Sequence, residues 1–317
     1  MPRFAVLDDG WGDADSERAY VARTVAGALA CHGAVDVVIP GPPGPPRPDG
    51  AFRLITAGHP SAPGASWPAV ADAALPPDRY DGVVVVGAAP ALPAELARSL
   101  TTGPVATLDF DGGTSPAVDG HDVGFFVSVN PTARTAPLGG IGCTDYVLVL
   151  GGNAPAPTLA TPAHDPARLP AAARWLIARF PRRFVLTVVD GGVTVWRDRS
   201  PHGWFAVGTR MDLWRLMAFA HVTVDPLPGP VVARECIESL LFGTPVVVPA
   251  TGPARSHAAA GGATYRNVAA LLDAVDGVSD PARRAALSSS GLAYATDRYG
   301  SPRRLVDAIG TVFGLPT

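Results

Sequence analysis

The chain contains no lysine, so all 25 of its basic side chains are arginines, and charged residues make up only 17% of its 317 positions. The formal net charge is -3. Acidic and basic residues are too evenly balanced for a nucleic acid or an anionic membrane to be held by bulk electrostatics. Any bound phosphate must therefore be held by arginine, by backbone N–H groups or by a helix N-terminus. The missing lysine and the 35 glycines and 34 prolines are typical of a GC-rich, actinobacterial-type genome.

Cysteine is scarce, with Cys31, Cys143 and Cys236 widely spaced along the chain. Three separated cysteines favour neither a disulfide framework nor a metal cluster, and the seven histidines show no metal-ligand spacing. No unbroken apolar run approaches the roughly 20 residues of a membrane span, and the N-terminus does not resemble a signal peptide. We expect a cytoplasmic protein with no integral membrane segment and no metal.

Several catalytic motifs are also missing. The sequence has no Gly-x-Ser-x-Gly elbow and no Walker phosphate loop, which disfavours hydrolase and kinase activities. Residues 6–12 fall short of a complete Gly-x-Gly-x-x-Gly pattern, which argues against a nicotinamide enzyme.

Short runs rich in valine, isoleucine and phenylalanine alternate with helical patterns, and this alternation predicts an α/β protein with buried parallel strands. In the first half we expect a helix over 16–29 and an exposed, proline-rich loop over 40–49. The strands expected there are 4–7, 35–39, 52–55, 82–86, 105–108 and 124–129.

A second series starts with a strand over 145–150. It continues with helices near 170–180, 211–220 and 231–242, and with strands 184–189, 221–224 and 245–248. Two such series predict two Rossmann-like lobes, 1–140 and 141–317, with the alternative that a final helix over 302–315 packs back on the first lobe. Ligands bind at the carboxyl edges of parallel sheets, so an inter-lobe cleft is the expected site.

Residues 207–247 carry a specific resemblance. They run from Val-Gly-Thr-Arg at 207–210, through a helix, a strand and a second helix containing Glu238, to Gly-Thr-Pro-Val-Val at 243–247. This order resembles the donor-binding lobe of family-four glycosyltransferases of the GT-B fold, and the tail at 291–300 is similar too. The resemblance implies transfer of a sugar from a nucleotide-diphosphate sugar, which is a substrate, so no cofactor is expected.

Physical chemistry suggests how such a donor would be held. A diphosphate is well neutralised by an arginine beside a helix N-terminus. Arg210, which follows a glycine near a predicted strand end, is the first candidate for that cation, and Arg234 is the second. The turn formed by Gly151, Gly152 and Asn153 can approach a phosphate or sugar closely, although it is equally compatible with an ordinary tight turn.

The resemblance assigns three further donor contacts. Glu238 would accept hydrogen bonds from the ribose hydroxyls, Thr244 belongs to the Gly-Thr-Pro match, and His257 occupies a place near the sugar or phosphate. Without the resemblance, Glu238 would be interpreted as a solvated residue of an amphipathic helix.

The first lobe resembles the family more loosely. Its glycine-containing loop carries three candidate acceptor-side residues, Gly10, Gly12 and Asp13. Asp109 occupies the place of a histidine that contacts the donor sugar in many members. Asp109 or Asp111 could act as a general base toward an acceptor hydroxyl, with His121 as a base or proton shuttle. Turn formation is the competing explanation for the two aspartates.

The chain also departs from the family pattern. Retaining members carry a second glutamate eight places before the ribose-binding one, and that place is Pro230 here. Proline can neither bind a sugar hydroxyl nor carry charge. Three explanations stay open: an unusual donor such as a deoxysugar, a different mechanism, or a catalytically silent relative that acts as a binding or accessory protein. Beyond the donor and a small-molecule or glycan acceptor, the partners left open are a second copy of the chain and a partner transferase.

Overall fold

The computed structural model describes residues 1–8, 17–40, 47–49, 51–57, 80–86, 97–98, 100–109, 117–118, 121–122, 126–141, 143–151, 171–189, 192–226 and 233–315. The chain forms two compact units. Unit 1 comprises Met1–Phe126 together with Ser301–Thr317, and unit 2 comprises Val127–Gly300. The segment 127–140, which sequence analysis assigned to the first lobe, lies in unit 2, and the last helix lies in unit 1.

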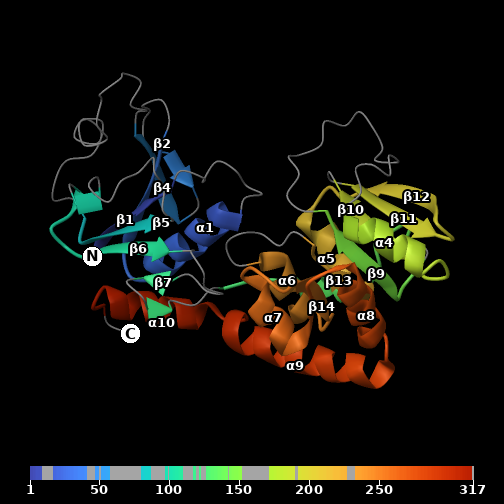
Figure 1. The fold of residues 1–317 in the computed structure, drawn as a ribbon. Coiled ribbons are helices and arrows are strands. Elements are labelled where there is room, and N and C mark those ends of the chain that lie inside the picture. The colour runs from blue at the N-terminus through green and yellow to red at the C-terminus, as the bar shows by residue number, and fades with distance from the viewer. Residues whose placement is uncertain are drawn as a thin grey trace, which may run out of the picture. The chain divides into compact units, whose positions relative to one another are not determined.

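Unit 1 contains an eight-stranded sheet in the order β3-β4-β2-β1-β5-β6-β7-β8 (Figure 1). Five strands are parallel: β1 (Arg3–Leu7), β2 (Ala34–Pro40), β4 (Phe52–Ala57), β5 (Gly82–Val86) and β6 (Val105–Asp109). Three short strands pair antiparallel at the two ends of the sheet: β3 (Arg47–Asp49), β7 (Ala117–Val118) and β8 (His121–Asp122). Every residue of the valine-rich β5 is buried, as expected for a central parallel strand.

Two helices distant in sequence pack together in unit 1. They are α1 (Glu17–Ala30) and α10 (Pro302–Val312). His32, just after α1, places Nε2 3.3 Å from the carbonyl oxygen of Val306, and the ring of Phe313 meets that of Phe4 edge to face at 5.5 Å. The C-terminal helix thus covers the start of the first strand of unit 1.

The strands expected in the first half are confirmed as β1, β2, β4, β5 and β6. The expected strand over 124–129 is wrong for its described part, because 126–129 form none. The expected loop over 40–49 is wrong at its end, where Arg47–Asp49 pairs with β4 as strand β3.

Unit 2 contains a seven-stranded sheet in the order β12-β11-β10-β9-β13-β14-β15. Its parallel strands are β9 (Tyr146–Leu150), β10 (Val185–Val189), β13 (Ala220–Val224), β14 (Val246–Pro249) and β15 (Gly262–Tyr265). The antiparallel strands β11 (Gly192–Arg197) and β12 (Ser200–Ala206) extend it beyond β10. Its helices are η1 (Pro131–Arg134), α4 (Ala171–Arg179), α5 (Arg210–Phe219), α6 (Arg234–Leu241), α7 (Ala254–Gly261), α8 (Val268–Val278) and α9 (Pro281–Tyr299).

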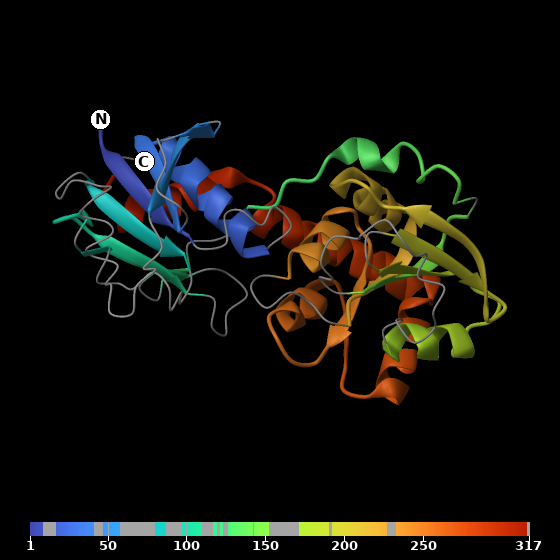
Figure 2. The same ribbon diagram turned by 90° about the horizontal axis from the view of Figure 1, so that it is seen from above.

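Side chains alternate between the two faces of the unit 2 sheet, as the two-residue strand period requires. Val147 and Val149 of β9 pack with α4 and α8, whereas Leu148 and Leu150 pack with α5 on the other face. The short helix η1 lies beside α5 (Figure 2). Among the described residues, no helix has the length and apolarity needed to cross a membrane.

Chain direction distinguishes the two edges of this sheet. α6 follows the carboxyl end of β13 and leads back to the amino end of β14. α5 leads directly into the amino end of β13, so α5 and α6 both begin toward the carboxyl edge and end at the amino edge. Gly243, with φ of 68°, terminates α6 in the left-handed conformation that glycine adopts readily.

Candidate functional site

Helix α5 begins at the carboxyl edge of unit 2 with a capping box. Thr209 accepts a hydrogen bond from the backbone N–H of Asp212 at 3.2 Å, and Asp212 accepts one from the backbone N–H of Thr209 at 3.1 Å. These reciprocal bonds satisfy two backbone donors and define the first turn. They place Arg210 at the first helical position, at the edge where ligands of parallel sheets bind.

Arg210 reaches across to the first turns of α6. Its Nε donates to Oε1 of Glu238 at 3.1 Å, and its Nη2 donates to Oε2 of the same carboxylate. The same Nη2 also donates to Oε1 of Glu235 at 2.9 Å. From within α6, Arg234 donates through Nε to Oε1 of Glu238 at 2.9 Å. We call these four side chains the arginine cluster.

Exposure differs sharply within the arginine cluster. The side chain of Glu238 is 0% exposed, those of Arg234 and Glu235 are 14% and 22% exposed, and that of Arg210 is 31% exposed. A carboxylate buried as deeply as Glu238 is tolerable because two guanidinium groups hydrogen-bond to it. The outer pair, Arg210 and Glu235, is the part that a ligand from solvent can reach.

The charges of the cluster stabilise one another. Burial acts most strongly, to raise the pKa of Glu235, but the charges of Arg210 and Arg234 and the hydrogen bonds from Arg210 and from the backbone together hold that pKa below its ordinary value. Burial likewise acts to lower the pKa of Arg210, and the charges of Glu238 and Glu235 raise it instead. Glu235 and Arg210 are therefore both ionised near neutral pH.

The N-terminus of α6 lies beside these side chains. Its N-cap, Ala233, has φ of 52° and ψ of 55°, and no side chain caps the helix. An alanine cannot offer the oxygen with which serine or aspartate satisfies the first backbone N–H groups. Arg234 occupies the first position, so a guanidinium and the positive end of the helix dipole lie together at this helix end, an arrangement suited to an anion.

A carboxylate that sequence reasoning missed lies at the end of β13. Asp225 is 3% exposed, and the thiol of Cys236 on α6 lies 3.7 Å from its Oδ2. Burial raises the pKa of Tyr265 to about 12, and the negative charge of Asp225 contributes in the same direction. An aspartate directly after a valine-rich strand was the signal that could have revealed this position.

Two residues expected at the donor site make contacts with residues outside the arginine cluster. Thr244 stands before the amino end of β14, where its hydroxyl donates to the carbonyl oxygen of Met217 at 2.7 Å. His257 is buried on α7, with Nδ1 3.1 Å from the hydroxyl of Tyr294 and its ring 5.5 Å from that of Tyr299. Thr244 faces α5 and His257 faces α9.

Gly151 follows β9 at the carboxyl edge, and a Cβ there would overlap the carbonyl oxygen of Val188. The close approach of β10 thus supplies a packing reason for this glycine. Gly152 and Asn153 lie outside the described residues.

The candidate residues of unit 1 lie near one end of its sheet where they are described. Asp109 ends β6 and is in register with Ala117 of β7, and His121 of β8 is in register with Val118. Their backbones are therefore separated by a single strand. Four other candidates, Gly10, Gly12, Asp13 and Asp111, lie outside the described residues.

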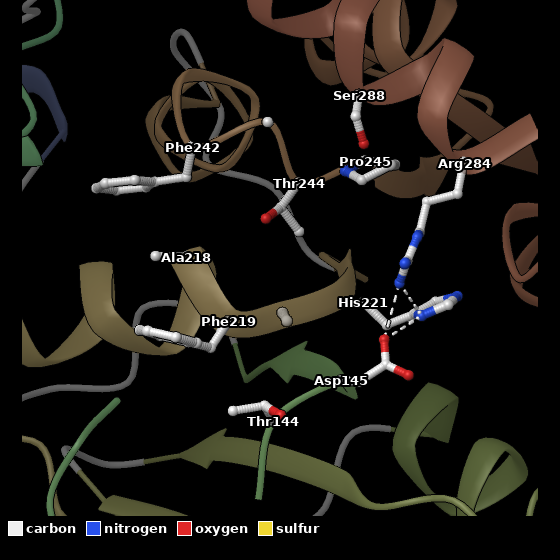
Figure 3. A pocket seen from close by; sticks show the side chains of 12 residues that line it. Thr144, Asp145, Ala218, Phe219, His221, Phe242, Thr244, Pro245, Arg284 and Ser288 are labelled. Carbon is white, nitrogen blue, oxygen red and sulfur yellow. Dashed lines mark hydrogen bonds and ion pairs between the residues drawn. The ribbon is translucent and has the colours of Figure 1, made fainter. Parts of the chain in front are cut away.

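A pocket of about 340 Å³ opens at the opposite, amino edge of unit 2 (Figure 3). Asp145 and His221, at the starts of β9 and β13, meet Arg284 of α9 there. Nδ1 of His221 lies 2.6 Å from Oδ1 of Asp145, and Nη1 of Arg284 donates to the same oxygen at 2.8 Å. Thr244 also lines this pocket, so the pocket is separate from the arginine cluster.

Metal binding has no candidate in the described part of the chain, because no three His, Cys, Asp or Glu side chains there are grouped as ligands. The arrangement at the carboxyl edge offers two guanidinium groups, a helix N-terminus and a partly exposed carboxylate. These groups suit a ligand that carries both phosphate and hydroxyl groups.

No family model and no curated protein matches the sequence. Several solved structures are similar to the structure of this chain. HepE from Anabaena, in complexes with UDP and glucose and with UDP-glucose, is 14% identical, with 99% of this chain and 100% of that chain covered and a TM-score of 0.62. The glycotransferase of kitacinnamycin is 15% identical, with 99% of each chain covered and a TM-score of 0.59.

WaaG, a glycosyltransferase involved in lipopolysaccharide biosynthesis, is 14% identical, with 96% of this chain and 99% of that chain covered and a TM-score of 0.53. At these identities the likeness concerns the fold. The two parallel-sheet units, each described above, match this set of structures along nearly their whole length. The chain therefore has the mixed α/β fold of GT-B glycosyltransferases.

Proposed function

We propose that the protein is a glycosyltransferase that uses a nucleotide-diphosphate sugar, bound at the carboxyl edge of unit 2. The observation that carries the proposal is the arginine cluster, in which Arg210 and Arg234 each occupy the first position of a helix. In a chain without lysine, a diphosphate at this edge must find its cations among the arginines, and these two lie at helix N-termini. HepE, which shares the fold, has been crystallised with UDP-glucose.

The contacts proposed for the donor phosphates are based on the positions of the two arginines and of the N-terminus of α6. The diphosphate would lie at the N-terminus of α6 and accept hydrogen bonds from the guanidinium groups, and the helix dipole and the guanidinium charges would neutralise its charge as the leaving group departs. The donor is a hexose or deoxysugar nucleotide in this proposal. Because Pro230 replaces the glutamate that binds the sugar in retaining relatives, fewer hydroxyl contacts favour a deoxysugar.

Acceptor activation is assigned to unit 1. Asp109, Asp111 or His121 would accept the proton of the acceptor hydroxyl, which attacks the anomeric carbon as the bond to the diphosphate breaks. The glycine-containing loop with Gly10, Gly12 and Asp13 would contact the acceptor.

A panel of nucleotide sugars tests the proposal, with release of free nucleotide measured in the presence and absence of candidate acceptors. Acceptor-dependent release that Arg210→Ala abolishes supports a transferase. Position 230 carries a proline where retaining relatives carry a glutamate, and this substitution favours a second candidate, a binding or accessory protein for a partner transferase. Tight nucleotide-sugar binding without turnover across the acceptor panel would favour that second candidate.

A further inference from the structure

The amino-edge pocket of unit 2 is lined by polar side chains from several elements (Figure 3). Asp145 directly precedes β9, and His221 belongs to β13. Arg284 and Ser288 line the pocket from α9, and Phe219 adds a partly exposed aromatic ring at the end of α5. The volume of about 340 Å³ lies at the lower end of the range for small-molecule sites, about 300–1,000 Å³. The proposed donor site leaves this pocket without a role.

Asp145 and Arg284 hold each other but keep unused hydrogen-bonding groups. Oδ1 of Asp145 takes both of its partners, with Nδ1 of His221 at 2.6 Å and Nη1 of Arg284 at 2.8 Å. Oδ2 of that carboxylate, and Nε and Nη2 of Arg284, make no hydrogen bond to any residue that the structure describes. The side chains are 65% and 37% exposed, respectively, so the pocket presents a free acceptor beside free donors.

Nδ1 of His221 cannot satisfy both of its neighbours at once. It lies 2.6 Å from Oδ1 of Asp145 and 2.5 Å from Nη1 of Arg284. Because a guanidinium only donates, a proton on Nδ1 serves the carboxylate but faces a second donor. A bare Nδ1 serves the guanidinium but faces a second acceptor. A ligand oxygen that accepts from Arg284 would draw the guanidinium away and remove this conflict, so the three side chains are better satisfied with a ligand bound.

The chemistry of these groups selects a neutral ligand rich in hydroxyl groups. Burial acts most strongly on Asp145, to raise its pKa, but the contacts with His221 and Arg284 hold that pKa below its ordinary value, so the carboxylate is an acceptor near neutral pH. A free anion would meet Asp145, and a free cation would meet Arg284. A hydroxyl group both donates and accepts, which suits the two neighbours, and the apolar face of a sugar ring suits the aromatic ring of Phe219.

We infer that the amino-edge pocket binds a neutral sugar ring, whose hydroxyl groups contact Asp145 and Arg284. The pocket lies at the opposite edge of the sheet from the arginine cluster, and the contacts inferred here involve no nucleotide. The inference goes beyond the proposed function and is tested separately from it. The main competing explanation is an anion site, in which Arg284 holds a phosphate or a carboxylate.

Saturation-transfer NMR with the methyl glycosides of glucose, galactose, mannose and rhamnose tests the inference. The wild-type protein is expected to bind at least one of them with a dissociation constant of about 1 mM, the affinity of a small ligand that forms a few hydrogen bonds. For that glycoside, Arg284→Gln and Asp145→Asn should each weaken binding by about tenfold or more, the value of one charge-assisted hydrogen bond. Asparagine tolerates the left-handed backbone at position 145, where φ is 65°, so this variant should keep the fold.

Ser288→Leu tests the pocket without removing a charge. Ser288 lines the pocket from α9, so the larger side chain should fill part of the space and abolish glycoside binding. Arg283→Gln is the matched control, because it removes a guanidinium from an exposed position of the same helix that does not line the pocket. It should leave the glycoside affinity unchanged.

The inference is overturned if no methyl glycoside binds, if glycerol binds as tightly as the glycosides, or if Arg284→Gln and Ser288→Leu both leave glycoside binding unchanged. Inorganic phosphate that binds the wild-type protein more tightly than every glycoside, and is lost with Arg284→Gln, would also overturn it in favour of an anion site. None of these measurements uses a nucleotide, so their outcome is independent of whether the proposed function holds.

Discussion

Arg210 donates from both Nε and Nη2 to the two carboxylate oxygens of Glu238, which lies 28 positions later on the neighbouring helix. This bidentate pair joins the beginning of α5 to the second turn of α6 at the carboxyl edge of the unit 2 sheet. Because Glu238 has no exposed surface, the pair is both a structural link between two helices and the support of the candidate donor site.

Glu238→Ala should lower the stability of unit 2 by about 3–5 kcal/mol, because it leaves two guanidinium groups facing a partly buried space without their shared carboxylate. Glu235→Ala should cost less, since its side chain is partly solvated. Hydrogen exchange of the β9 and β13 amides measures both effects within unit 2. Equal protection in the two variants would show that the buried pair contributes little.

Arg210→Ala should weaken nucleoside diphosphate binding by about 1.5–3 kcal/mol, the range for a hydrogen bond to a charged group. Arg210→Lys keeps the charge but loses the planar fork, so it should recover only part of the affinity. Arg303→Ala serves as the control, because that side chain is 88% exposed and lies in unit 1. Calorimetry with the tightest-binding diphosphate measures all three, and an unaffected Arg210→Ala would remove Arg210 from the donor site.

Gly291→Ala should destabilise unit 2 by about 1–3 kcal/mol through overpacking. A Cβ at Gly291 would lie 2.9 Å from the Cα of Gly261 and 2.7 Å from Cδ2 of Leu240, so α9 and α7 could not keep their close crossing. Gly27→Ala in α1 is the matched control, because a Cβ there meets nothing within 4 Å. That change should stabilise unit 1 by about 0.5–1 kcal/mol. Urea unfolding of each variant distinguishes the expected loss of stability from the expected gain. An unchanged stability of Gly291→Ala would contradict the tight crossing of α7 and α9.

Acid should selectively weaken unit 1 through Asp36, whose side chain is 5% exposed. Burial acts to raise its pKa, but hydrogen bonds from Arg53 and Tyr80 and the charges of Arg53 and Arg3 hold that pKa below its ordinary value. A lowered folded-state pKa gives stability that is present above the unfolded value of about 3.9 and is lost as the pH falls through the folded value.

The stability difference between wild type and Asp36→Asn should therefore be large at pH 7 and should shrink below about pH 4. Hydrogen exchange of the β1 and β2 amides at pH 7 and at pH 3 measures this difference within unit 1. A difference that stays constant between the two pH values would show that Asp36 does not contribute through its charge.

Strand positions were predictable because valine-rich runs such as β5 and β9 have strong intrinsic preferences and are buried on both faces. The strand β15 was missed, since Gly262–Tyr265 is short and only its pairing with β14 makes it a strand. The strand β3 was missed because its proline-rich composition favours a loop, and pairing with β4 overrides that preference.

The candidate site was predictable only in part. Arg210 and Glu238 could be chosen individually, from a helix start and from a resemblance, but their pairing depends on how α5 and α6 pack across the sheet. Glu235 carried no local signal because a glutamate in the first turn of a helix is usually solvated. The meeting of Asp145, His221 and Arg284 likewise follows from the parallel sheet, which brings the starts of β9 and β13 together.

Crystals soaked with the nucleoside diphosphate that binds most tightly give the most direct test of the donor site. The account predicts density for the diphosphate within hydrogen-bond distance of a guanidinium of the arginine cluster and of the N-terminus of α6. Density for the diphosphate only at the amino-edge pocket beside Arg284, or an unoccupied arginine cluster at saturating nucleotide, would contradict it.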